Sequence, residues 1–254
     1  MARIRMLRRN RIEFSLTLRL VLFASLFSPA CGLRKDPSRS RNVSVPSLAK
    51  TIDGPVNYVA LGDSTGAGVG AKEGGYVVRL FKRILTVRPA SKLTNLCFSG
   101  ATTEDVLRDQ VDPAVRSNPS LITLGIGIND VGHGLSIDVF AQNYDRILAR
   151  LSSETDAVIV VTNIPDISMA PQLPRAVRRE YNQRIVDFNQ KLGEIASRHG
   201  VIAFDIYSVT HEQPKSHPEF FSEDGFHPSD KGYESWAKEM WPTVARVIGA
   251  ERKE

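Results

Sequence analysis

The sequence of 254 residues has few of the features that mark specialised classes of protein. It contains two cysteines, too few for the disulfide framework of a small secreted scaffold. It has no internal repeat and no low-complexity tract, and 42% hydrophobic residues argue against a disordered chain. A chain of this length can bury a complete core, so we expect one folded domain besides a processed N-terminus.

Beyond its first 30 residues the chain also lacks an excess of charge of either sign. The formal net charge is +5, and residues 1–30 account for all of it with six arginines and one acid, Glu13. The remainder is formally neutral and carries no basic surface suited to a nucleic acid. We therefore expect no DNA or RNA partner.

No apolar run reaches the roughly 20 residues that a membrane-spanning helix needs. The N-terminal region instead has a basic stretch (1–11), a short uninterrupted apolar core (20–27) and the small-x-small sequence Ser28-Pro29-Ala30. This order is typical of an export signal that is cleaved after Ala30. We expect residues 1–30 to be a signal peptide and the protein to be exported, as a periplasmic, extracellular or membrane-anchored protein.

The position of Cys31 leaves two kinds of mature N-terminus open. A bacterial lipoprotein signal places its lipidated cysteine directly after small residues, as here, but Ser28 stands where such signals usually have Leu. Lipidation of Cys31 would tether the protein to a membrane, whereas ordinary cleavage would leave the same N-terminus without lipid. Residues 31–54 are polar and contain scattered Pro and Ser, which predicts a flexible tether ahead of a folded domain at 55–250.

Short apolar runs alternate with longer helical patterns across this domain. The predicted strands are 56–61, 93–98, 121–126, 157–162 and 201–205, and the predicted helices are roughly 75–88, 102–110, 137–153, 176–199 and 229–249. Such alternation indicates βαβ units and a parallel sheet covered by helices on both faces. Ligands of these sheets bind beyond the carboxyl ends of the strands, so residues that follow strands are the candidates for function.

Polar turns follow each of the first three predicted strands. Ser64 offers a hydroxyl group, and Gly100 allows its backbone N–H to approach a ligand closely. Asn129 offers an uncharged amide N–H that is suited to stabilising an oxyanion. Each turn taken singly is also an ordinary loop, because Gly, Asp, Asn and Ser all favour turns.

A further polar pair precedes the last predicted helix. Asp224 stands three residues before His227, which places the two side chains about one helical turn apart. A carboxylate there can accept a hydrogen bond from Nδ1 of the histidine and leave the other ring nitrogen to face a nucleophile. The pair alone is a weak signal, but it would supply the base that a serine nucleophile needs.

Together these blocks resemble the SGNH (GDSL-type) serine hydrolase family. They occur in the family's order and cover the whole predicted domain, roughly residues 56–249. One position departs from the common pattern, since Thr65 follows Ser64 where the family often has Leu. The matching residues are, in chain order, Ser64, Gly100, Asn129, Asp224 and His227.

The resemblance implies a three-layer α/β/α domain with a five-stranded parallel, flavodoxin-like sheet, and the activity of a serine esterase. It implies that Ser64 attacks an acyl ester to form an acyl-serine, that His227 is the general base and that Asp224 orients it. The oxyanion hole would consist of the backbone N–H groups of Ser64 and Gly100 and the side chain of Asn129.

We expect no cofactor and no metal. His199, His211 and His217 lack metal-ligand spacing with nearby carboxylates or thiolates. Residues 66–71 loosely match a dinucleotide-binding pattern, but the predicted strand ends well before them and Gly74-Gly75 interrupts the helix that should follow.

The sequence leaves the substrate open among lipid, lysophospholipid, acetylated carbohydrate and other small-molecule esters. In the loop after the fourth strand, Ile167, Met169 and Leu173 are candidates for contact with an acyl chain. The alternative function is a non-catalytic binding module of the cell envelope on the same fold. The presence of the complete serine, aspartate and histidine set favours the enzyme.

Overall fold

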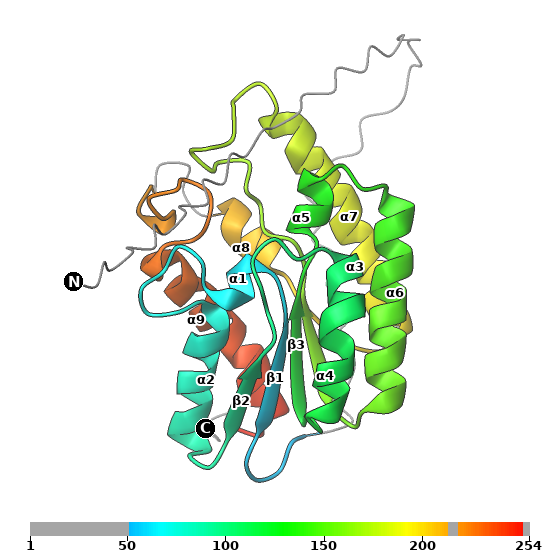
Figure 1. Ribbon diagram of the computed structural model, residues 1–254. Helices are drawn as coiled ribbons and strands as arrows, with labels where there is room; N and C mark the ends of the chain where they lie inside the picture. The colour runs from blue at the N-terminus through cyan, green and yellow to red at the C-terminus, as the bar shows by residue number, and fades with distance from the viewer. Residues whose placement is uncertain (1–50, 213–217, 251–254) are drawn as a thin grey trace, which may run out of the picture. The chain divides into compact units, whose positions relative to one another are not determined.

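The computed structural model describes residues 51–212 and 218–250, which contain a central sheet with helices on both faces (Figure 1). All strand pairs are parallel, and their order is β2-β1-β3-β4-β5. This confirms the predicted five-stranded, flavodoxin-like sheet. The strands are β1 (Asn57–Gly62), β2 (Lys92–Asn95), β3 (Leu121–Gly125), β4 (Val158–Thr162) and β5 (Ile202–Phe204).

The helical segments follow the strands along the chain. Two of them, η1 and η2, are a π-helical and a 3-10 turn respectively. The segments are α1 (Ser64–Ala67), α2 (Tyr76–Val87), α3 (Thr103–Asp105), η1 (Val106–Gln110), α4 (Val111–Arg116), α5 (Ile128–Gly132), α6 (Ile137–Glu154), α7 (Arg178–Arg198), α8 (Ile206–Glu212), η2 (Pro218–Phe220) and α9 (Asp230–Val247).

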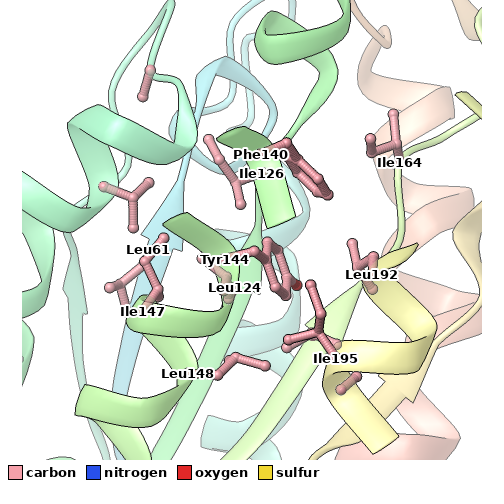
Figure 2. Packing of buried hydrophobic residues seen from close by; sticks show 14 of the residues in the cluster. Leu61, Leu124, Ile126, Phe140, Tyr144, Ile147, Leu148, Ile164, Leu192 and Ile195 are labelled. Atoms are coloured by element: carbon pink, nitrogen blue, oxygen red, sulfur yellow. The ribbon is translucent and has the colours of Figure 1, made fainter. Parts of the chain in front are cut away.

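Both faces of the sheet are buried, which explains the nearly continuous apolar runs of its central strands. Along β1, Tyr58 and Ala60 belong to the core formed with α2 and α9, whereas Val59 and Leu61 belong to the core formed with α4, α6 and α7. Figure 2 shows part of the second core, in which Leu124 of β3 belongs to the same cluster as Phe140 and Tyr144 of α6. Burial of each large apolar side chain contributes roughly 1.5–3 kcal/mol to stability.

The central strands end level with one another. Gly62 of β1 pairs with Gly125 of β3, and Gly125 pairs with Thr162 of β4. A Cβ on Gly62 would lie 2.3 Å from the carbonyl oxygen of Gly125, so the strands approach too closely for any other residue. The turns that follow β1 and β3 therefore start at the same edge, and α1 and α5 lie beyond it (Figure 1).

Some predicted boundaries differ from the structure. The second strand ends at Asn95 rather than at residue 98. Residues 96–98 lie in the following loop, where Leu96 and Cys97 still pack against the core and so look like strand residues in the sequence. The helix predicted over 102–110 continues through η1 into α4 and includes Pro113.

The predicted signal peptide, Cys31 and residues 31–50 of the predicted tether lie outside the described residues. Residues 51–54 are described, and Ile52 is buried with its N–H donating to the carbonyl of Val247 over 2.8 Å. The packed chain thus includes Ile52, although the polar composition of the segment predicted a start at residue 55. Within 51–212 and 218–250, no helix is long and apolar enough to cross a membrane.

Candidate active site

Ser64 is the first residue of α1, directly beyond the end of β1. The preceding Asp63 caps this short helix, since its Oδ1 accepts hydrogen bonds from the backbone N–H and the hydroxyl of Thr65, both at 2.9 Å. Only 4% of Ser64 is exposed. The strand end and the cap together hold the Ser64 hydroxyl at the edge of the sheet.

His227 and Asp224 lie next to Ser64, although about 160 residues separate them from it in the sequence. Nε2 of His227 is 3.0 Å from Oγ of Ser64, and Nδ1 of His227 is 2.6 Å from Oδ2 of Asp224. The structure thus joins the three predicted residues in one chain of hydrogen bonds. In this order the imidazole can receive the serine proton while the carboxylate balances the resulting charge.

The loop that carries Asp224 is built to keep its carboxylate ionised. Burial by itself favours the neutral acid. However, hydrogen bonds from His227, from the backbone N–H of Phe226 and from the hydroxyl of Ser222 outweigh burial and lower the pKa of Asp224 well below its usual range. The Asp224 side chain is partly exposed, with 42% of its surface accessible. It therefore stays charged across the neutral range.

The turns with Gly100 and Asn129 are joined to each other. Nδ2 of Asn129 donates to the carbonyl oxygen of Ala101 over 2.8 Å. The neighbouring Asp130 is fully buried and accepts from both the backbone N–H and the hydroxyl of Thr103. Gly100 is exposed, and no atom lies within 4 Å of where its Cβ would be. The two turns therefore hold their N–H donors in a fixed relation, with open space beside Gly100.

A glycine explains the sharp start of the Asn129 turn. Gly127 has a φ angle of +127°, a backbone conformation that residues with a side chain rarely adopt. A Cβ there would lie 2.8 Å from Cδ1 of Ile164. Ile164 belongs to the loop after β4 and packs in the core. The close contact presses the start of α5 against that loop and brings Asn129 to the edge of the sheet.

A cavity of about 330 Å³ opens beside Ser64 and His227. Its walls are mainly apolar and come from the loop after β4, from α8 with α9 and from the segment 218–228, together with residues of α1 and α5. The predicted contacts Ile167 and Met169 line it, whereas Leu173 packs against the core instead. The other large apolar residues on its walls are Ile128, Ile206, Phe220, Phe221, Phe226 and Trp236.

Sequence reasoning missed several polar residues around this cavity. Asp166 is buried in its wall, and its Oδ2 is 2.7 Å from Nδ1 of His211. Arg175 and Arg178 also line the cavity. Arg178 donates to the carbonyls of Leu173 and Ala170 and so holds the loop together. These pairs form only through tertiary packing, which the sequence does not display.

Of the other histidines, His133 and His199 make no hydrogen bond to Ser64 in the described part of the chain. His199 lies near α6, with Nε2 3.0 Å from the carboxylate of Asp145. His133 is exposed at the end of α5 and is not among the residues that line the cavity. His217 lies outside the described residues.

Asp63 makes stability depend on pH in a direction unusual for an acid. Burial raises the pKa of Asp63 to about 6, although hydrogen bonds from Thr65 oppose this shift. Between pH 4 and pH 6 the unfolded chain loses this proton while the folded protein keeps it, so stability falls as pH rises. The contribution amounts to roughly 3 kcal/mol.

The variant Asp63→Asn retains an oxygen for Thr65 but cannot titrate. Its unfolding free energy relative to the wild type should therefore increase by roughly 2 kcal/mol between pH 4 and pH 7, because the unfolded carboxyl is already partly ionised at pH 4. Urea unfolding of both proteins at the two pH values measures this difference. A relative stability that stays constant, or that declines toward neutral pH, would contradict the raised pKa.

Known proteins share both the sequence pattern and the fold. Residues 60–235 match the model of the GDSL-like lipase/acylhydrolase family. The spore germination lipase LipC of Bacillus licheniformis is 28% identical over 210 residues, which cover 73% of this chain and 94% of that protein.

Two solved structures illustrate the shared fold. A catalytic mutant of Axe2, an acetylxylan esterase from Geobacillus stearothermophilus, has a TM-score of 0.66 at 18% identity and covers 80% of this chain and 100% of its own. A lipase/acylhydrolase from Enterococcus faecalis has a TM-score of 0.62 at 22% identity, with 78% and 100% covered. The family match extends over well more than half of the sequence. This chain therefore belongs to the GDSL-like lipase/acylhydrolase family and is a carboxylic ester hydrolase.

Proposed function

We propose that the enzyme hydrolyses its ester through a covalent acyl-serine on Ser64. The observation that carries the proposal is the continuous chain from Oγ of Ser64 through the His227 ring to the Asp224 carboxylate. Oγ attacks the acyl carbon as its proton passes to Nε2 of His227. The imidazolium then gives this proton to the departing alcohol. Water, deprotonated by the same nitrogen, attacks the acyl-serine, and the imidazolium returns the proton to Oγ of Ser64 as the acid is released.

The negative charge that develops on the carbonyl oxygen needs N–H donors. Ser64 supplies one, because its backbone N–H is in the first turn of α1 and has no partner within that helix. Gly100 supplies another from its open turn, and Asn129 has a second side-chain N–H besides the one bound to Ala101. Donors fixed by the folded chain lower the barrier because they need little rearrangement during the reaction.

The cavity supports an ester with an apolar acyl chain as the substrate. A volume of about 330 Å³ is far larger than an acetyl group, and Ile167, Met169 and Phe226 offer no hydrogen bonds to a sugar. The cavity begins at the two residues that would handle the acyl carbon, Ser64 and His227. We therefore place the acyl chain along this cavity and the alcohol at its open side.

A series of p-nitrophenyl esters tests this substrate class. Each methylene group that enters the cavity should contribute up to about 0.8 kcal/mol. We accordingly expect kcat/KM for the octanoyl ester to exceed that for the acetyl ester by about 100-fold or more. Steady-state rates at low substrate concentration measure the ratio. A preference for the acetyl ester would contradict the assignment of the cavity to the acyl chain.

A filled cavity should remove this preference. Met169 lies half-buried in the wall, so Met169→Trp should lower kcat/KM for the octanoyl ester at least tenfold and change the acetyl ester little. Val139→Trp is the matched control, because Val139 is exposed on α6 and is not among the residues that line the cavity. Equal losses for both esters in Met169→Trp would point to general damage rather than to a blocked acyl site.

A further inference from the structure

Just before Ser64, strand β1 is paired with β3 over a longer stretch than with β2. β1 pairs with β3 as far as Gly62, but its pairing with β2 stops at Ala60, opposite Asn95. Gly62 therefore has a strand on one side only. It stands two residues before Ser64, so any movement of Gly62 displaces both the hydroxyl and the backbone N–H of that serine.

The side chain of Gln110 takes the place of the missing strand. Its Oε1 accepts from the N–H of Gly62, and its Nε2 donates to the carbonyl of Gly62, both over 2.8 Å. Only 1% of Gln110 is exposed. The amide thus makes the two bonds that a neighbouring strand would offer to Gly62. The backbone N–H of Phe98 makes only a longer contact of 3.4 Å with the same carbonyl.

A local irregularity aims Gln110 at this position. It is the last residue of the π-helical turn η1, which lies between α3 and α4. A π turn inserts one extra residue and so changes which side chains face inward. Turns of this kind often occur at functional sites. Here Val106, Gln110 and Val111 are all buried, so the turn adds a polar group to an otherwise apolar face.

The same segment carries a second proposed donor. Gly100 lies at the start of the stretch that ends at Gln110, and a capping box between Thr102 and Asp105 rigidifies the start of α3. Gln110 therefore connects the turn with Ser64 to the turn with Gly100. Asp130, bound to Thr103, connects the latter to Asn129.

We infer that Gln110 is a positioning residue for ester hydrolysis, which holds the backbone N–H of Ser64 in register with that of Gly100. The inference rests on the proposed oxyanion hole and adds to it the group that sets its geometry. Gln110 does not touch the reacting atoms and acts through Gly62. Its loss should therefore change transition-state stabilisation more than substrate binding.

The variant Gln110→Met tests this, since it keeps the length of the side chain and removes both bonds. We expect kcat to fall by about 10–100-fold while KM changes less than threefold. The reason is that a misplaced N–H donor stabilises the developing oxyanion of the transition state less well but hardly changes substrate binding. A second variant, Gln110→Glu, has nearly the same shape and retains an acceptor for the Gly62 N–H. Its kcat should lie between that of Gln110→Met and that of the wild type, at least about threefold below the wild type, and it keeps the test open if Gln110→Met fails to fold.

Asn57→Leu is the matched control. Asn57 lies at the other end of β1, and its side-chain amide donates to the carbonyls of Ser117 and Asn118. Its loss should lower the melting temperature without a change in kcat for the folded protein. Rates are compared at a temperature where all variants are folded by circular dichroism.

The possible results separate the two claims. A kcat within twofold of the wild type in folded Gln110→Met or Gln110→Glu would overturn the positioning role. A rise in KM with unchanged kcat would overturn it as well. If Ser64→Ala is inactive in the same experiment, the proposed mechanism stands despite either outcome. If Ser64→Ala is fully active, the mechanism itself fails.

Discussion

Replacement of Ser64 by Ala is expected to lower kcat for ester hydrolysis by about 10⁴-fold or more. Oγ of Ser64 is the atom that lies 3.0 Å from Nε2 of His227, and alanine removes it. The fold should persist, because alanine fits the start of α1 and the Asp63 cap binds Thr65 rather than Ser64. The measurement is kcat with an octanoyl aryl ester, accompanied by a thermal melt.

Ser153→Ala provides the matched control for this loss. Ser153 is exposed on α6 and is not among the residues that line the cavity, so its removal deletes a hydroxyl of the same kind without touching the site. Its kcat should equal that of the wild type. A kcat of Ser64→Ala close to that of Ser153→Ala would contradict the acyl-serine mechanism.

Asp224→Asn should be almost as damaging, with a loss of about 10⁴-fold in kcat. The carboxylate accepts from Nδ1 of His227 over 2.6 Å and so keeps the proton on that nitrogen. An asparagine can turn its N–H₂ toward Nδ1, which would move the ring proton to Nε2, the nitrogen that must receive the proton of Ser64. KM should change little, because Asp224 is not among the residues that line the cavity.

The adjacent Glu223 offers a control of the same charge. It is exposed, and Glu223→Gln removes one negative charge one residue away from Asp224. If Asp224 acts through its hydrogen bond to His227, Glu223→Gln should keep nearly full activity. Equal losses in Asp224→Asn and Glu223→Gln would indicate that only the net charge of the loop matters.

The apolar runs of the sequence were sufficient to predict the central strands, whereas the order of the sheet was implied by the resemblance to the SGNH family. Strands buried on both faces are marked directly by their apolar runs, as in the Val158–Thr162 strand. Because the turns after such strands meet at one edge, Ser64 and Asn129 are candidates from their positions in the sequence, and the resemblance to the family then selects them. The exposed edge of the sheet was predicted less well. Leu96, Cys97 and Phe98 look like strand residues but lie in a loop.

The residues that support the site could not be predicted in the same way. Gln110 and Gly62 are 48 residues apart, and no periodic pattern marks a buried polar residue within a helix. The π turn that directs Gln110 inward has no signature of its own in this sequence. The pair of Asp166 with His211 likewise depends on the packing of the loop after β4 against α8, with 45 residues between the two side chains in the sequence. Apolar periodicity reports which side chains are buried, but not which polar groups meet.

Covalent labelling with a p-nitrophenyl alkylphosphonate tests the role of Ser64 without reliance on turnover, because this reagent reacts with an activated serine and mimics the tetrahedral intermediate. Intact-mass spectrometry should show one adduct per chain, and peptide mapping should place it on Ser64. Loss of activity should follow the extent of labelling, and Ser64→Ala should remain unlabelled. An adduct on another residue, or full activity in a protein labelled at Ser64, would contradict the acyl-serine mechanism.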